Sequence, residues 1–202
     1  MIPPAKNYKI GVLASTKGTV LQTIIDQIKA GNMPGIELVA VISNKKNAIA
    51  LERARREGLK TIFLDSKNKI RQEYDEELAN LLKKNQADLI VLIGYMRILT
   101  PEFIRKFPRR IINVHPAILP KFGGAGYFGS NVHKEVLKNN EKESGCTIHF
   151  VDEVVDGGEI ILQKKVAVAN DETEESLKEK VQALEKKWYP EVIKWFAEGK
   201  IK

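Results

Sequence analysis

The feature that most constrains the fold of this chain is the alternation, through its first half, of short apolar runs with segments of helical pattern. The apolar runs cover residues 9–15, 37–44, 61–64 and 88–94. The segments between them repeat apolar residues at helical spacing, over residues 21–28, 51–56 and 74–84. The last run, DLIVLIG, is apolar almost throughout, which is typical of a central strand covered on both faces. This alternation predicts a parallel, doubly wound sheet.

The second half has fewer helical segments between its expected strands, which cover residues 110–114, 146–151 and 159–168. The sheet is therefore expected to be mixed here. A last helix follows, which we expect Thr173 to cap and Pro190 to interrupt. Its apolar stripe consists of Leu177, Val181, Leu184 and Trp188. We predict a single α/β domain over residues 1–202, with a Rossmann-like sheet that is parallel in its N-terminal half, mixed in its C-terminal half, and covered by helices on both faces.

Composition limits the classes of function. The 202 residues carry a formal net charge of +7 at pH 7, which favours anionic ligands. The lysines are spread along the expected helices, so a solvated surface is favoured over a nucleic-acid interface. Cys146 is the single cysteine, which excludes an internal disulfide, and no cluster has zinc spacing. No apolar run approaches the roughly 20 residues that span a bilayer. We expect a cytoplasmic protein with no metal, nucleic-acid or membrane partner.

Asn113 and His115 are the strongest candidates for catalysis. They are separated by one residue on an expected strand, so their side chains point the same way. An Asn amide can stabilise a developing oxyanion, a His can carry a proton, and a carboxylate such as Asp156 would favour the protonated ring. No Ser or Cys nucleophile has a recognisable setting, which favours direct transfer between two substrates. On the chemistry alone, His115 could equally be a hydrogen-bonded turn residue before Pro116.

The turn over residues 15–20 follows the first expected strand and opens onto a helix. Free N–H groups and the helix dipole at such a position favour an anion. Gly18 permits close approach of the backbone, and Lys17 adds positive charge. The turn matches neither the P-loop nor the dinucleotide-binding pattern. A phosphate site and an ordinary strand–helix turn both remain open from the turn alone.

Residues 113–120, NVHPAILP, with Asp156-Gly157-Gly158 downstream, resemble the formyltransferases that use 10-formyltetrahydrofolate. The likeness continues over nearly the whole chain, in residues 41–45, 51–54, 94–99 and 144–151. It implies transfer of the formyl group of 10-formyltetrahydrofolate to the amine of phosphoribosylglycinamide in purine biosynthesis, without a metal. It also implies a nucleotide-binding half, about 9–110, and a catalytic and folate-binding half, about 111–202, in a monomer or homodimer.

The resemblance assigns roles to individual residues. Asn113 and protonated His115 would stabilise the oxyanion of a tetrahedral intermediate, while Asp156 keeps His115 protonated and assists proton transfer. Gly18, Thr19 and Val20, with Lys17 adding charge, match the segment that holds the substrate phosphate. Glu185 matches the residue that binds the ribose hydroxyls, although a surface glutamate is equally consistent with the sequence.

The expected folate pocket comprises Arg71, Met96, Arg97, Ile98, Leu99, Val151, Asp152 and Glu153. Met96 and Leu99 could instead be core residues. His149 is expected to support the catalytic groups rather than to react, and His133 to cap or pack a helix. The glycine-rich residues 123–130 suit a mobile cover over the site.

Two residues depart from the family pattern in the phosphate turn. Thr16 replaces a glycine and Val20 replaces a polar side chain, which leaves the formyl acceptor open. A transfer-RNA formyltransferase would be expected to carry a further C-terminal domain, and a formyltetrahydrofolate hydrolase a further N-terminal one. A non-catalytic nucleotide- or folate-binding module would not need Asn113, His115 and Asp156 together.

Overall fold

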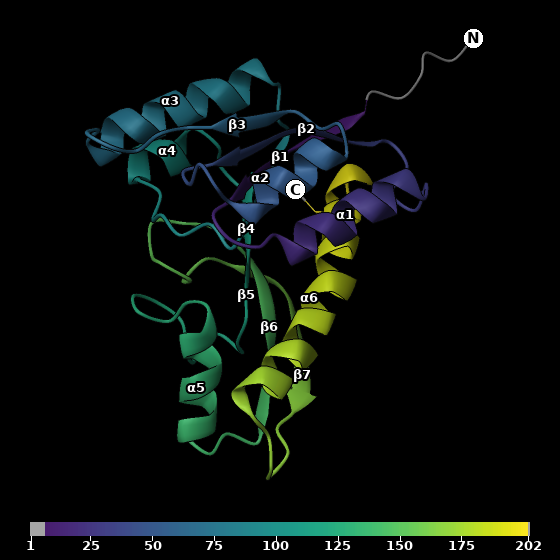
Figure 1. Cartoon of the computed structure of the whole chain (residues 1–202), viewed down its shortest axis with the longest axis vertical. Helices are drawn as coiled ribbons and strands as arrows, with labels where there is room; N and C mark the ends of the chain where they lie inside the picture. Colours follow the sequence, from purple (N-terminus) through teal and green to yellow (C-terminus); the bar gives the residue numbers. More distant parts are fainter. Residues whose placement is uncertain (1–6, 202) are drawn as a thin grey trace.

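The structure is a computed structural model that describes residues 7–201 (Figure 1). One seven-stranded sheet has the order β3-β2-β1-β4-β5-β6-β7. The strands are β1 (Tyr8–Ala14), β2 (Ile36–Ser43), β3 (Thr61–Phe63), β4 (Leu89–Ile93), β5 (Ile111–His115), β6 (Glu143–Phe150) and β7 (Ile160–Ala167). Strands β1 to β5 pair in parallel, and β6 and β7 join antiparallel. The predicted parallel half and mixed half of one sheet are confirmed.

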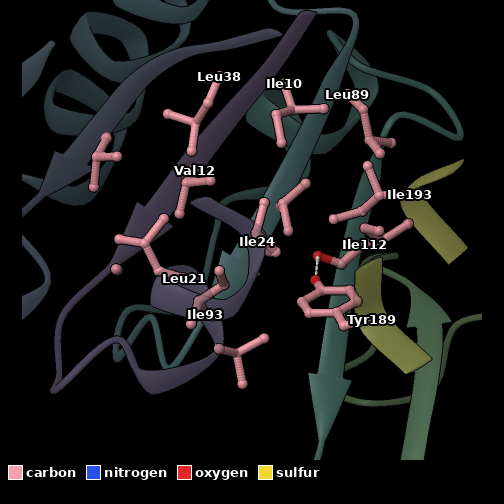
Figure 2. Packing of buried hydrophobic residues seen from close by; sticks show 14 of the residues in the cluster. Ile10, Val12, Leu21, Ile24, Leu38, Leu89, Ile93, Ile112, Tyr189 and Ile193 are labelled. Atoms are coloured by element: carbon pink, nitrogen blue, oxygen red, sulfur yellow. Dashed lines mark hydrogen bonds between the residues drawn. The ribbon is translucent and has the colours of Figure 1, made fainter. Parts of the chain in front are cut away.

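Helices cover both faces of the sheet (Figure 1). They are α1 (Thr19–Lys29), α2 (Ile49–Arg56), α3 (Arg71–Lys84), α4 (Pro101–Arg105), α5 (Ser130–Lys138) and α6 (Glu174–Ala197). Apolar residues of α1, α2 and α6 form one core with the sheet, which Figure 2 shows from close by. Residues of α3 and α4 form the second core on the other face. Within residues 7–201, no helix is long and apolar enough to cross a membrane.

The expected interruption at Pro190 is wrong, because α6 runs unbroken from Glu174 to Ala197. A proline inside a helix costs about 3 kcal/mol through its missing N–H group and its ring. Here the residues around Pro190 are deeply buried, with Tyr189, Val192 and Ile193 all at 0 % exposure. Their packing against the sheet outweighs the local cost. The expected cap is confirmed, since the Thr173 side chain accepts a hydrogen bond from the Ser176 N–H at 3.1 Å.

The strand order reverses at the carboxyl ends of β1 and β4. The chain moves from β1 outward to β2 and β3, and then returns to β4 on the other side of β1. Ligands of such sheets bind where the strand order reverses. The two loops that border this point are joined, because Ser15 N–H donates to Gly94 O at 3.2 Å and Met96 N–H donates to Ser15 Oγ at 3.0 Å.

Candidate active site

Asn113 and His149 lie opposite one another on β5 and β6. The Asn113 Nδ2 atom is 3.2 Å from His149 Nε2. The other ring nitrogen of His149, Nδ1, lies 2.8 Å from the carbonyl oxygen of Phe150. A carbonyl group only accepts, so Nδ1 carries the proton and the Nε2 lone pair accepts from the Asn113 amide. The neutral ring of His149 therefore fixes the orientation of the Asn113 side chain.

Burial supports the neutral state of His149. The residue is only 1 % exposed, and burial lowers the pKa of its ring below the usual value. The Phe150 carbonyl and the Asp156 carboxylate oppose this shift, the latter from 3.6 Å. His149 thus lies beside Asn113, a position consistent with the supporting role that the sequence suggested.

His115 is enclosed between a backbone carbonyl and a carboxylate. Its Nε2 atom lies 2.7 Å from Phe122 O, and its Nδ1 atom lies 3.4 Å from Asp156 Oδ2. Both neighbours are acceptors, and only the protonated ring has a hydrogen on each nitrogen. Each ring nitrogen of His115 therefore has an acceptor as its neighbour. The ring is more enclosed than a strand end suggests, with 4 % exposure, because the segment around Phe122 covers it.

Asp156 is held in place by its own backbone and by the covering loop. Its φ of 56° lies in the left-handed region, which is uncommon for a residue other than glycine. Its Oδ2 atom accepts a hydrogen bond from the Gly124 N–H at 3.0 Å. A Cβ atom on Gly158 would lie 1.9 Å from Phe150 O, so this position tolerates only glycine. The turn over residues 156–158 therefore aims the Asp156 carboxylate at both His115 and His149.

The phosphate turn has the geometry of an open helix N-terminus. Gly18 precedes α1 with φ 64° and ψ 39°, and no side chain caps the helix. The first helical bond runs from Gln22 N to Gly18 O at 3.1 Å, so the N–H groups of the preceding turn lack helical partners. These groups belong to Thr19, Val20 and Leu21.

Close packing explains the glycine at position 18. A Cβ atom there would lie 2.8 Å from the Cβ atom of Ala50 on α2. The neighbouring Lys17 is exposed, and its carbonyl group accepts from Arg53 Nε at 2.9 Å. The side chain of Val20 is 3 % exposed and belongs to the core. Position 20 can therefore offer a ligand only its backbone.

Glu185 is not a surface glutamate. It lies on α6, is only half-buried, and yet burial raises the pKa of its carboxyl group from 4.5 to about 7, with Lys186 opposing the shift. Among residues 7–201, no side chain or backbone group forms a hydrogen bond or ion pair with this carboxylate. An acceptor that is desolvated and lacks a partner is suited to hydroxyl donors of a ligand.

The segment after β4 separates into a core residue and exposed residues. Leu99 is 6 % exposed and packs in the core beneath α3, as its alternative interpretation suggested. Met96 and Ile98 are 45 % and 49 % exposed, which is high for large apolar side chains. The Arg97 guanidinium stacks on the Tyr74 ring at 4.2 Å, and its Nε atom is buried without a hydrogen-bond partner.

The second expected folate segment is also exposed. Val151 packs at the edge of the same core, whereas Asp152 and Glu153 are open to solvent. Glu153 forms an ion pair with Arg105 at 2.7 Å. Arg71, at the start of α3, is exposed.

Several groups at the site have no signature in the sequence. Thr147, fully buried opposite His115, donates to Ala117 O at 2.7 Å and accepts from Leu119 N at 3.1 Å, which holds the turn after β5. Gln163 on β7 donates to the same hydroxyl at 2.9 Å. His133 is buried with an unpartnered Nδ1 atom, and burial lowers its pKa, in agreement with packing. Only the register of β6 against β5 and β7 could have identified Thr147 and Gln163.

The fold is that of an α/β enzyme, and Asn113, His115 and Asp156 lie together at the carboxyl end of β5. The chain belongs to the formyl transferase family, whose model matches residues 8–193. It is 41% identical over 195 residues to the phosphoribosylglycinamide formyltransferase of Haemophilus influenzae, covering 96% of this chain and 89% of that protein. The Escherichia coli phosphoribosylglycinamide formyltransferase is 41% identical over 194 residues, with the same coverage. The crystal structure of glycinamide ribonucleotide transformylase 1 from Symbiobacterium toebii superposes with a TM-score of 0.90 at 40% identity, covering 96% of this chain and 90% of that one.

Proposed function

We propose that this enzyme transfers the formyl group of 10-formyltetrahydrofolate to the amine of phosphoribosylglycinamide in purine biosynthesis, in the cytoplasm. The observation that carries the proposal is the convergence of Asn113, His115 and Asp156 at one strand end in a chain 41% identical to enzymes of that name. The contact of His115 with Asp156 and the neutral ring beside Asn113 support the same chemistry.

The ribonucleotide is held at two places. The free N–H groups of Thr19 and Val20, with Gly18 and the Lys17 ammonium beside them, receive the phosphate. Glu185 accepts hydrogen bonds from the ribose hydroxyls, for which its carboxylate has unused capacity. Because Val20 contributes only its N–H group, its departure from the family pattern does not remove the anion site.

Asn113 and His115 act on the oxygen of the formyl group. When the substrate amine attacks the formyl carbon, a C–N bond forms and negative charge develops on that oxygen. The free N–H of Asn113 and the Nε2–H of His115 stabilise this charge, and the Asp156 carboxylate keeps the ring protonated. The amine then loses a proton, the bond from the formyl carbon to the folate nitrogen breaks, and that nitrogen gains a proton. His149 holds Asn113 in the required orientation throughout.

The covering segment must release His115 for this to happen. The Nε2 atom of His115 lies 2.7 Å from Phe122 O. The formyl oxygen takes the place of this carbonyl group, so residues 122–124 shift when both substrates bind. The positive φ angles of Gly124, Gly126 and Gly129 give the following loop backbone conformations that other residues rarely adopt.

The folate lies between the two exposed segments that follow β4 and β6. Met96 and Ile98 offer apolar side chains on one side, and Leu99 supports them from the core. Backbone groups of Val151, Asp152 and Glu153 contact the pteridine, and Arg71 and Arg97 supply positive charge for the acidic tail. In this arrangement residues of about 9–110 hold most of the nucleotide, and residues of about 111–202 supply catalysis.

The test is a turnover assay with purified protein, 10-formyltetrahydrofolate and phosphoribosylglycinamide. Formylated amine and free tetrahydrofolate are expected in equal amounts. Loss of formyl groups without the amine would indicate a hydrolase, and turnover only with another phosphorylated amine would change the acceptor. His115→Ala should abolish turnover while it retains ribonucleotide binding by calorimetry; loss of that binding would contradict its catalytic role.

A further inference from the structure

The hydroxyl group of Tyr189 ties the last helix to the strand that carries Asn113. Tyr189 lies on α6 and is fully buried. Its hydroxyl oxygen is 3.0 Å from the carbonyl oxygen of Leu92 on β4 and 3.0 Å from that of Ile112 on β5. Figure 2 shows the bond to Ile112. A hydroxyl has one hydrogen, so the two carbonyl groups share a single donor.

These two carbonyl groups mark the place where β4 and β5 stop pairing. The last register pair between the strands is Leu92 with Asn113. Beyond it, β4 ends at Ile93, while β5 continues beside β6 to His115. The Tyr189 hydroxyl therefore joins the ends of β4 and β5, beside the strand end that carries Asn113 and His115.

The carbonyl group of Ile112 belongs to the peptide unit that leads into Asn113. Ile112 packs in the core beneath α6, and Asn113, the next residue, points to the opposite face. Because a peptide unit is planar and rigid, a donor that holds the Ile112 carbonyl also holds the backbone N–H group of Asn113 and the Cα atom that bears its side chain.

The same helix carries Glu185, four residues before Tyr189 and hence about one turn away. The Tyr189 ring belongs, with Ile112 and Ile193, to the core that α1, α2 and α6 form with the sheet (Figure 2). The ring sets the distance of α6 from the sheet. The hydroxyl links α6 to the strands, because it reaches carbonyl groups of both β4 and β5.

We propose that Tyr189 is a positioning residue for formyl transfer, whose hydroxyl fixes the place of Glu185 relative to Asn113. The ribose of the substrate and its reacting amine are thereby held at a fixed distance from one another. This inference rests on the proposed function, since it takes Glu185 and Asn113 as the groups that contact the substrate.

Tyr189→Phe tests the proposal, because it keeps the ring and removes only the donor. The KM for the ribonucleotide should rise and kcat should fall, with kcat/KM reduced about tenfold or more, while the KM for 10-formyltetrahydrofolate stays unchanged. Thr173→Ala is the matched control, since it weakens the same helix at its cap, where Thr173 accepts from Ser176 N at 3.1 Å. That control should lower the melting temperature and leave the kinetic constants unchanged. Circular dichroism verifies that each variant is folded at the assay temperature.

A second measurement does not depend on activity. The side-chain amide resonances of Asn113 in the ligand-free protein should shift in Tyr189→Phe and stay in place in Thr173→Ala. Unchanged Asn113 resonances in Tyr189→Phe, or equal kinetic losses in the two variants, would overturn the positioning role. Absence of turnover in the unaltered protein would instead refute the proposed function, and the amide resonances would still decide the role of Tyr189.

Discussion

Glu185→Gln is expected to stabilise the protein at neutral pH while it weakens the binding of the ribonucleotide. Burial raises the pKa of the Glu185 carboxyl from 4.5 to about 7. At about 1.36 kcal/mol for each pKa unit, ionisation of this group costs roughly 3 kcal/mol more in the folded protein than in the unfolded chain. Glutamine has nearly the same shape and no charge, so it avoids that cost.

The pH dependence gives this prediction its sign. Since the pKa is higher in the folded state, the unfolded chain loses the Glu185 proton first as the pH rises. This group therefore lowers the free energy of unfolding between pH 4.5 and about 7, and its effect levels off above that range. The gain from glutamine should be close to zero at the lower limit. At about pH 8 it should reach about 1–3 kcal/mol, the smaller value allowing for desolvation of the amide.

Urea denaturation, monitored by circular dichroism at pH 4.5 and at about pH 8, measures the gain in the free energy of unfolding. Glu191→Gln on the same helix is the control, because Glu191 is ion-paired with Lys194 at 2.7 Å and its side chain is 40% exposed. That control should not become more stable as the pH rises. Equal gains at both pH values for Glu185→Gln, or a loss at the higher one, would refute the reasoning from burial. An unchanged ribonucleotide affinity by calorimetry would refute the ribose contact.

Four further predictions follow from the structure. His149→Phe removes the acceptor of the Asn113 amide and should lower kcat about tenfold at saturating substrates. In the unaltered protein, burial lowers the pKa of His149, so the unfolded chain binds the proton first as the pH falls below 6.5. The free energy of unfolding should therefore decrease below that pH. ¹⁵N spectra measure the pKa of the His149 ring, and melting curves measure the stability. Gly18→Ala places a Cβ atom 2.8 Å from that of Ala50 at a positive φ; it should cost about 1–3 kcal/mol in urea denaturation and weaken phosphate binding. Burial raises the pKa of Cys146 to about 12, so a thiol reagent at neutral pH should label it only in denaturant.

The sequence predicts the order and direction of the strands well, because hydrophobic periodicity depends on which faces are buried. It misplaces the start of β6, which begins at Glu143 rather than Cys146. Ser144 and Gly145 have the composition of a turn, yet a Cβ atom on Gly145 would lie 1.9 Å from the Lys164 carbonyl of β7. The glycine permits close approach of two strands, a tertiary requirement that no local pattern expresses. The same limit explains Pro190, whose burial overrides its local preference.

Side-chain alternation was enough to place Asn113 and His115 on one face of a strand. It could not reveal that Phe122 O and Gly124 N–H complete the contacts of His115 and Asp156, because every residue has such backbone groups. Nor could it choose between an exposed and a buried Glu185, since a position at the edge of an apolar stripe is compatible with both. Burial of that carboxyl group depends on how α6 lies against β6, which only the folded chain determines.

Two of the residues expected to contact the substrates carry polar groups that lack partners among residues 7–201. The Glu185 carboxylate forms no hydrogen bond or ion pair within residues 7–201, and Arg97 Nε is buried without an acceptor. The buried Arg97 Nε atom costs stability because neither water nor a protein acceptor reaches it. The half-buried Glu185 carboxylate costs stability through the burial that raises its pKa. Fully paired side chains would give a more stable protein, but they would have no donors or acceptors left for a substrate. The unsatisfied groups are therefore better explained as binding capacity held in place by the surrounding packing than as defects of the fold.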